Sequence, residues 1–183
     1  MADRLLEEGM AFFRRGQRDA ALEKFREAAA SYAAAEDPTG QGEALNNAAV
    51  IYRLQRRWQE AADAFDRART LFREAGEVAR QGQVLGNLGD LYARRGDDEA
   101  AARLYGEGAA LLAQAGEHDN QAQILRALSL LRLRQRRFLE AMMLMDASLE
   151  ARPRLSLSQR LFRPLLSFAL RLLTGGREPP GGV

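Results

Sequence analysis

The stretch that decides the fold is residues 45–65, LNNAAVIYRLQRRWQEAADAF, together with its counterpart at residues 85–105, LGNLGDLYARRGDDEAAARLY. In both, a leucine is followed four places later by a small residue and three places after that by a tyrosine, and an alanine-x3-aromatic pair closes the stretch. The alanine recurs at a constant spacing of 40 residues, at Ala21, Ala61, Ala101 and Ala141. Self-similarity of this kind is typical of a solenoid, in which each unit buries its apolar face against its neighbours.

Small residues also recur twelve places before each of these alanines, at Gly9, Ala49, Gly89 and Ser129. Small side chains at matching places predict close helix crossings, because a larger side chain would force the helix axes apart. The sequence therefore predicts an all-α fold, an α-solenoid of four helical hairpins. We expect first helices near 2–15, 41–55, 81–95 and 121–135, and second helices near 18–35, 58–75, 98–115 and 138–151.

The spacing Leu-x3-small-x2-aromatic followed by Ala-x3-aromatic resembles the tetratricopeptide repeat, and the resemblance covers residues 2 to 153, with Pro153 where that repeat usually carries its proline. The period exceeds the roughly 34 residues of the common form, and this longer form is similar to the repeats of kinesin light chains and of polarity adaptors. The added residues, as in 36–41, are expected to lengthen the second helix or its exit loop. The resemblance implies a right-handed superhelix with repeats at about 2–40, 41–80, 81–120 and 121–153.

The resemblance also implies a concave groove, lined by the first helices, that accepts a peptide or helical segment of a protein partner. In such arrays the groove-facing stripe starts one place after the leucine and continues four and seven places further on. Carried onto this sequence, with neighbouring polar residues added, the candidate groove residues are Leu6, Met10, Phe13, Asn46, Asn47, Val50, Arg53, Asn87, Asp90, Arg94, Arg126, Leu130 and Leu133.

Asn47 and Asn87 share the place beside the first groove position of their repeats. An amide donates and accepts hydrogen bonds at once, which suits the backbone of an extended peptide. The alternative is a structural hydrogen bond to a neighbouring repeat. The nearby basic residues Arg53, Arg94 and Arg126 favour an acidic partner segment.

Charge divides the chain into unlike halves. Residues 1–119 carry 16 basic and 21 acidic side chains, whereas residues 120–183 carry 11 and 4. A basic C-terminal half favours an acidic protein or an anionic membrane surface as a partner, with nucleic acid the least expected. The apolar groove end at Leu6, Met10 and Phe13 leaves a homo-oligomer open as well.

Residues 154–174 form a predicted amphipathic helix whose polar side carries arginines and no acidic residue. Leu165, Ala169 and Leu172 continue the 40-residue register, which favours a helix that caps the last repeat. A helix that only caps the solenoid would instead have polar residues at the groove-stripe positions, which here are Leu166, Leu170 and Leu173.

The alternative interpretation of this helix is that it lies on an anionic membrane, which would make the chain a peripheral membrane adaptor or assembly factor. Residues 175–183 are rich in glycine and proline, and we expect a flexible tail there.

Catalysis and cofactor binding are not expected. The chain has no cysteine and a single histidine, His118, placed by the repeat pattern in a loop between repeats, so neither a histidine triad nor a multi-histidine metal site can be built. We therefore expect a non-catalytic scaffold or adaptor. The acidic start, unlike a secretory signal, predicts a cytoplasmic location, in part peripheral at an inner membrane. The 26 arginines beside the single Lys24 are typical of a GC-rich, bacterial genome.

Overall fold

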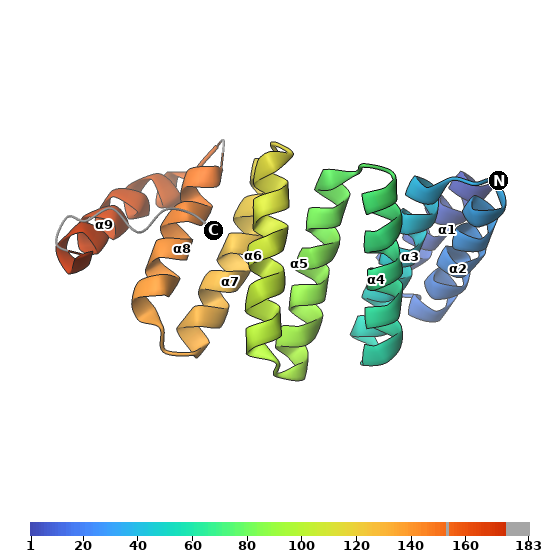
Figure 1. Ribbon diagram of the computed structural model, residues 1–183, viewed down its shortest axis with the longest axis horizontal. Coiled ribbons are helices and arrows are strands. Elements are labelled where there is room, and N and C mark those ends of the chain that lie inside the picture. Colours follow the sequence, from blue (N-terminus) through green and yellow to red (C-terminus); the bar gives the residue numbers. More distant parts are fainter. Residues whose placement is uncertain (153, 175–183) are drawn as a thin grey trace.

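The computed structural model describes residues 1–152 and 154–174. In this part of the chain the regular structure consists entirely of α-helices, which lie side by side along the long axis of the molecule (Figure 1). They are α1 (Ala2–Arg14), α2 (Arg18–Ala34), α3 (Pro38–Leu54), α4 (Trp58–Glu74), α5 (Val78–Arg95), α6 (Asp98–Gln114), α7 (His118–Arg134), α8 (Phe138–Ala151) and α9 (Leu157–Thr174). The expectations for Pro153 and for the tail at residues 175–183 lie outside the described residues.

Each helix packs mainly against the helices directly before and after it in the chain. The pairs α1 with α2, α3 with α4, α5 with α6 and α7 with α8 form the four hairpins, and α3 also touches α5 just as α5 touches α7. The predicted all-α solenoid is therefore confirmed. The first helices of successive repeats come into contact along one side of it.

The expectation for the added residues of the long repeat is wrong. They extend the first helix of the next repeat: α3, α5 and α7 begin at Pro38, Val78 and His118, three residues before the predicted starts, so His118 opens a helix and does not lie in a loop. In α3 the reason is local, because the Asp37 carboxylate accepts a hydrogen bond from the Gly40 backbone N–H at 2.9 Å. Pro38, with its fixed φ, then starts the helix without a free N–H to satisfy.

The turns repeat every 20 residues, within hairpins and between them alike. At each turn one residue has a positive φ, and these residues are Gly16, Glu36, Arg56, Gly76, Gly96, Gly116 and Arg136. The next backbone N–H returns to a carbonyl near the end of the preceding helix, as from Glu117 to Leu112 at 2.9 Å. This geometry satisfies carbonyls that the helix end leaves free. Gly76 and Gly116, which lie one 40-residue period apart, supply two of these left-handed caps.

At the helix crossings the core combines alanine and glycine with aromatic side chains, and buried leucine, isoleucine and valine side chains fill the rest. All four repeated alanines are buried, and a Cβ atom added to Gly89 would lie 2.6 Å from the ring of Tyr105. In the last repeat the Ser129 hydroxyl donates a hydrogen bond to the Ala141 carbonyl oxygen at 2.7 Å. Small residues thus fix the distance between the two helices of each hairpin.

Helix α9 rests on α8 through a side that the 40-residue register does not predict. Leu166 is its buried side chain, and the Ser167 hydroxyl donates to Asp146 Oδ1 at 2.9 Å. Leu165 and Leu172, the residues expected to pack as in a fifth repeat, are exposed. The leucine at position 166, unexpected in a cap, is thereby explained, because it is the residue that touches the solenoid.

Candidate functional site

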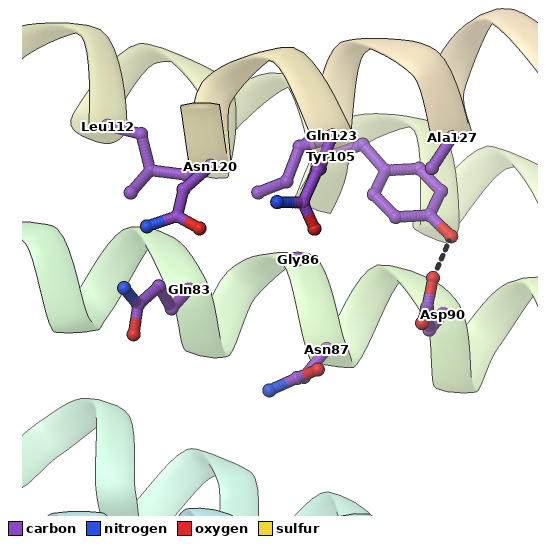
Figure 2. Close-up of a pocket in the computed structure, with 10 residues that line it drawn as sticks. Gln83, Gly86, Asn87, Asp90, Tyr105, Leu112, Asn120, Gln123 and Ala127 are labelled. Carbon is purple, nitrogen blue, oxygen red and sulfur yellow. Dashed lines mark hydrogen bonds between the residues drawn. The ribbon is translucent and has the colours of Figure 1, made fainter. Parts of the chain in front are cut away.

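A cavity of about 430 Å³ lies among α5, α6 and α7, on the side where first helices of successive repeats meet. Its lining residues are Gln83, Gly86, Asn87, Asp90, Tyr105, Leu112, Asn120, Gln123, Ile124 and Ala127. Figure 2 shows Asn120 and Gln123 reaching from α7 toward α5, which carries Gln83 and Asn87. The wall of the cavity is therefore rich in amides and carries one carboxylate.

Gly86 determines how closely α7 approaches α5. A Cβ atom at this position would lie 2.6 Å from Ile124 Cδ1, so any larger residue would displace the isoleucine. Ile124 fills the space that the glycine leaves and forms the apolar part of the lining together with Leu112 and Ala127. The lining of the site thus combines apolar and polar side chains.

Polar bonds join α3 to α5 along the same side of the solenoid. Asn87 Nδ2 donates to Asn46 Oδ1 at 3.0 Å, and Arg80 Nη1 donates to Glu43 Oε2 at 2.7 Å. For Asn87 the structural alternative, a hydrogen bond to the neighbouring repeat, is therefore present. The same side chain still lines the cavity.

Asp90 is held through both carboxylate oxygens. Tyr105 Oη donates to Oδ1 at 2.6 Å, and Arg53 Nη1 donates to Oδ2 at 3.4 Å. The Arg53 side chain is 10% exposed and that of Asp90 41% exposed. Burial lowers the pKa of the Arg53 guanidinium, and the charge of Asp90 acts in the opposite direction. Asp90 is thus oriented by two buried partners while it remains open to a ligand.

The other predicted groove residues divide by their surroundings. Leu6, Met10 and Phe13 are half-buried and pack against a core cluster that contains Phe25 and Ile51. Val50 packs in the same way against the cluster around Phe65, and Asn47 is half-buried. By contrast, the remaining predicted residues are exposed, and they are Arg94, Arg126, Leu130 and Leu133.

The prediction omitted three polar residues of the cavity, namely Gln83, Asn120 and Gln123. They precede the leucine of their repeat, whereas the expected stripe began after it. A signal was available in the sequence, since Gln83 and Gln123 are identical residues one period apart.

Two buried tyrosines, each of which donates a hydrogen bond to a carboxylate, predict a loss of stability at alkaline pH. Burial raises the pKa of Tyr32 to about 12, and its hydrogen bond to Asp3 acts in the same direction. Burial likewise raises the pKa of Tyr105, which is bonded to Asp90. An unfolded tyrosine has a pKa of about 10. Both pairs therefore contribute fully to the free energy of unfolding below pH 10. This contribution is lost as the pH rises toward the pKa values of the tyrosines in the folded state.

We expect the free energy of unfolding to fall above pH 10 by about 1.4 kcal/mol per pH unit for each tyrosine. Urea denaturation between pH 8 and 12 measures this slope. The double variant Tyr32→Phe with Tyr105→Phe should flatten it, and an unchanged slope in that variant would contradict the assignment.

Metal binding and membrane crossing were also considered for the described residues. Residues 1–152 and 154–174 contain no group of three or more histidine, cysteine, aspartate or glutamate side chains suited to a metal ion. In the same ranges no helix has the length and apolar character needed to cross a membrane. His118 lines a second cavity of about 540 Å³ beside Glu150 and Arg152.

Comparison with known proteins supports the repeat assignment. Residues 40–114 match the family model described as tetratricopeptide repeat. No curated protein sequence matches the chain. Among solved structures, the crystal structure of BtubC (BKLC) from P. vanneervenii has a TM-score of 0.73 at 18% sequence identity, and the match covers 100% of this chain and 67% of that chain. This structural likeness shows a shared fold. Residues 40–114 therefore carry the sequence pattern of the tetratricopeptide-repeat family, and the whole chain has the helical-hairpin architecture of a solenoid.

Proposed function

We propose that this chain is a non-catalytic scaffold that holds an extended peptide segment of a protein partner against α3, α5 and α7. Tetratricopeptide repeats generally mediate interactions between proteins. The observation that carries the proposal is the group of four amide side chains around one cavity, contributed by Gln83, Asn87, Asn120 and Gln123.

Amides are suited to a peptide backbone because each one offers both a donor and an acceptor. A strand of peptide exposes N–H and C=O groups in alternation, and neighbouring amides can match both. The cavity volume of about 430 Å³ falls within the common range of about 300–1,000 Å³ for ligand pockets. Its apolar lining residues Leu112, Ile124 and Ala127 would accept one small apolar side chain of the peptide.

The charges near the cavity favour acidic residues in the partner segment. Arg94 and Arg126 are exposed, and within the described residues neither forms a salt bridge. Asp90 is already held by Arg53 and Tyr105, so its charge is partly compensated. Because the two free arginines lie in solvent, their attraction for an acidic segment should weaken as salt rises.

A peptide selection tests the proposal. The full chain is used to select binders from a random peptide library, and the affinity of a labelled binder is measured by fluorescence anisotropy. Gln83→Ala with Gln123→Ala should weaken binding by about tenfold, since each substitution removes a hydrogen bond. Both side chains are exposed, so the fold should be retained.

The matched control removes two exposed glutamines from second helices, Gln59→Ala with Gln114→Ala, and should leave the affinity unchanged. Equal affinities for the groove variant and the control would place the binding surface elsewhere on the solenoid.

A further inference from the structure

Helix α9 faces the solenoid with its polar side. Its contacts to α8 include the hydrogen bond from Ser167 to Asp146 and the ion pairs of Arg163 with Asp146 at 3.9 Å and with Glu150 at 3.6 Å. Leu166 is the buried apolar residue of this contact. A surface helix of a globular protein normally turns its apolar stripe toward the core. In α9 this arrangement is reversed.

The opposite side of α9 presents a continuous apolar surface to solvent. Leu165 and Leu172 are each 68% exposed, and Phe168 is 63% exposed. The exposed large apolar residues of the helix are Leu157, Leu161, Phe162, Leu165, Phe168, Leu172 and Leu173. At about 100° per residue these positions share one broad sector of the helix. An apolar surface of this kind marks an interaction site.

The charged side chains that α9 itself carries are of one sign. Arg160 and Arg171 are exposed and lie on the helical wheel between the apolar sector and the side that meets α8. The third arginine of the helix, Arg163, is already paired with α8. From residue 151 to residue 177 the sequence contains no aspartate or glutamate. Along this edge the apolar sector therefore has a purely basic border.

We infer that the exposed face of α9 binds the surface of an anionic lipid bilayer, with the helix lying in the plane of the interface. Its large apolar residues enter the boundary between headgroups and acyl chains, and Arg160 and Arg171 meet the lipid phosphates. Charge complementarity selects this occupant, because an apolar protein surface would not require a border of one sign.

The position of α9 in the molecule suits this role. It lies at the end of the solenoid opposite α1 (Figure 1), and its ion pairs with α8 orient the apolar sector outward. Membrane docking by α9 would leave the cavity at α5 and α7 accessible, so the inference is independent of the proposed groove function.

Vesicle flotation tests the inference with the full chain. The chain should float with vesicles of equal parts phosphatidylglycerol and phosphatidylcholine, and it should stay with the soluble fraction when the vesicles contain phosphatidylcholine alone. Leu165→Glu with Phe168→Glu should lower the partition coefficient on the anionic vesicles by about tenfold or more, because two large apolar side chains no longer leave water. Arg160→Gln with Arg171→Gln should lower it by about fivefold for each arginine.

The matched control places the same added charge on another helix. Ala110→Glu with Ala113→Glu changes two exposed residues of α6 and should leave flotation unchanged. Insertion is read directly from Phe168→Trp in a Trp58→Phe background, which carries one tryptophan. Its emission should shift to shorter wavelength on the anionic vesicles.

Three outcomes would overturn the inference. They are failure of the full chain to float with anionic vesicles, equal flotation with neutral vesicles, and retained flotation of the folded Leu165→Glu, Phe168→Glu variant. Sedimentation equilibrium identifies the competing occupant. A dimer that this variant abolishes, in a chain that does not float, would assign the α9 face to a second copy.

Discussion

Replacing Phe65 with alanine is expected to lower the free energy of unfolding by about 3–5 kcal/mol. The Phe65 side chain is fully buried, at 0% exposure, in a cluster that includes Ala61, Phe72 and Leu88. These neighbours belong to helices fixed by close crossings, so they can only partly close the cavity that the substitution leaves. Urea denaturation monitored by circular dichroism measures the loss.

Phe138→Ala supplies the control for this experiment. Phe138 begins α8 and is 59% exposed, so its removal should change the free energy of unfolding by no more than about 0.5 kcal/mol. Since a repeat array transmits stability only between neighbours, hydrogen exchange in Phe65→Ala should accelerate most in α3, α4 and α5. A uniform acceleration along the whole chain would contradict this arrangement.

Asp90→Ala is expected to destabilise the protein by about 2–3 kcal/mol. The substitution leaves the buried Tyr105 hydroxyl without its acceptor and the Arg53 guanidinium without its counter-charge. The expected loss of stability is smaller than for a fully buried ion pair, because Asp90 is 41% exposed and water can replace part of the contact. Asp90→Asn keeps an acceptor for Tyr105 and should lose less.

A double-mutant cycle with Arg53→Met separates the ion pair from the rest of the effect. In the Arg53→Met background no buried charge remains to be left unpaired, so Asp90→Ala should cost less than it does in the unmodified chain. Urea denaturation of the four proteins gives the coupling energy. Strictly additive losses would show that Arg53 and Asp90 do not interact.

The sequence predicted the solenoid well because its geometry depends on residues that cannot vary in size. At a close crossing only glycine, alanine or serine fits, as at Gly89 and Ser129, so the spacing of small residues follows the spacing of the helices. The left-handed turns at Gly76 and Gly116 can also be predicted from the sequence, since glycine adopts a positive φ without strain.

The starts of α3, α5 and α7 were harder to predict, because two of the three depend on weak local sequence signals. Asp37 and Pro38 form a recognisable start, with a capping carboxylate and a proline at the first helical position. Glu77 and Glu117 precede α5 and α7 without a capping side-chain hydrogen bond. Alignment of the three repeats would have transferred the helix start recognised at Pro38 to the equivalent positions Val78 and His118.

The predicted groove and the cavity have two residues in common, Asn87 and Asp90, whereas Leu6, Met10 and Phe13 pack against the core. Burial of this kind depends on contacts between repeats, which the stripe pattern does not include. The orientation of α9 was also inaccessible, because it depends on Asp146 and Glu150 of α8 attracting its polar side.

The contacts between sequence neighbours also determine how the chain folds. Because each helix meets mainly the helices beside it in the chain, contacting residues are close in sequence and the relative contact order is low. Little loop-closure entropy opposes the first contacts, so a central hairpin such as α5 with α6 can form alone and then act as a template for its neighbours. Folding is then expected to be fast and to spread outward in both directions. We expect α9 to dock last, because its contact with the helix before it is the smallest between consecutive helices.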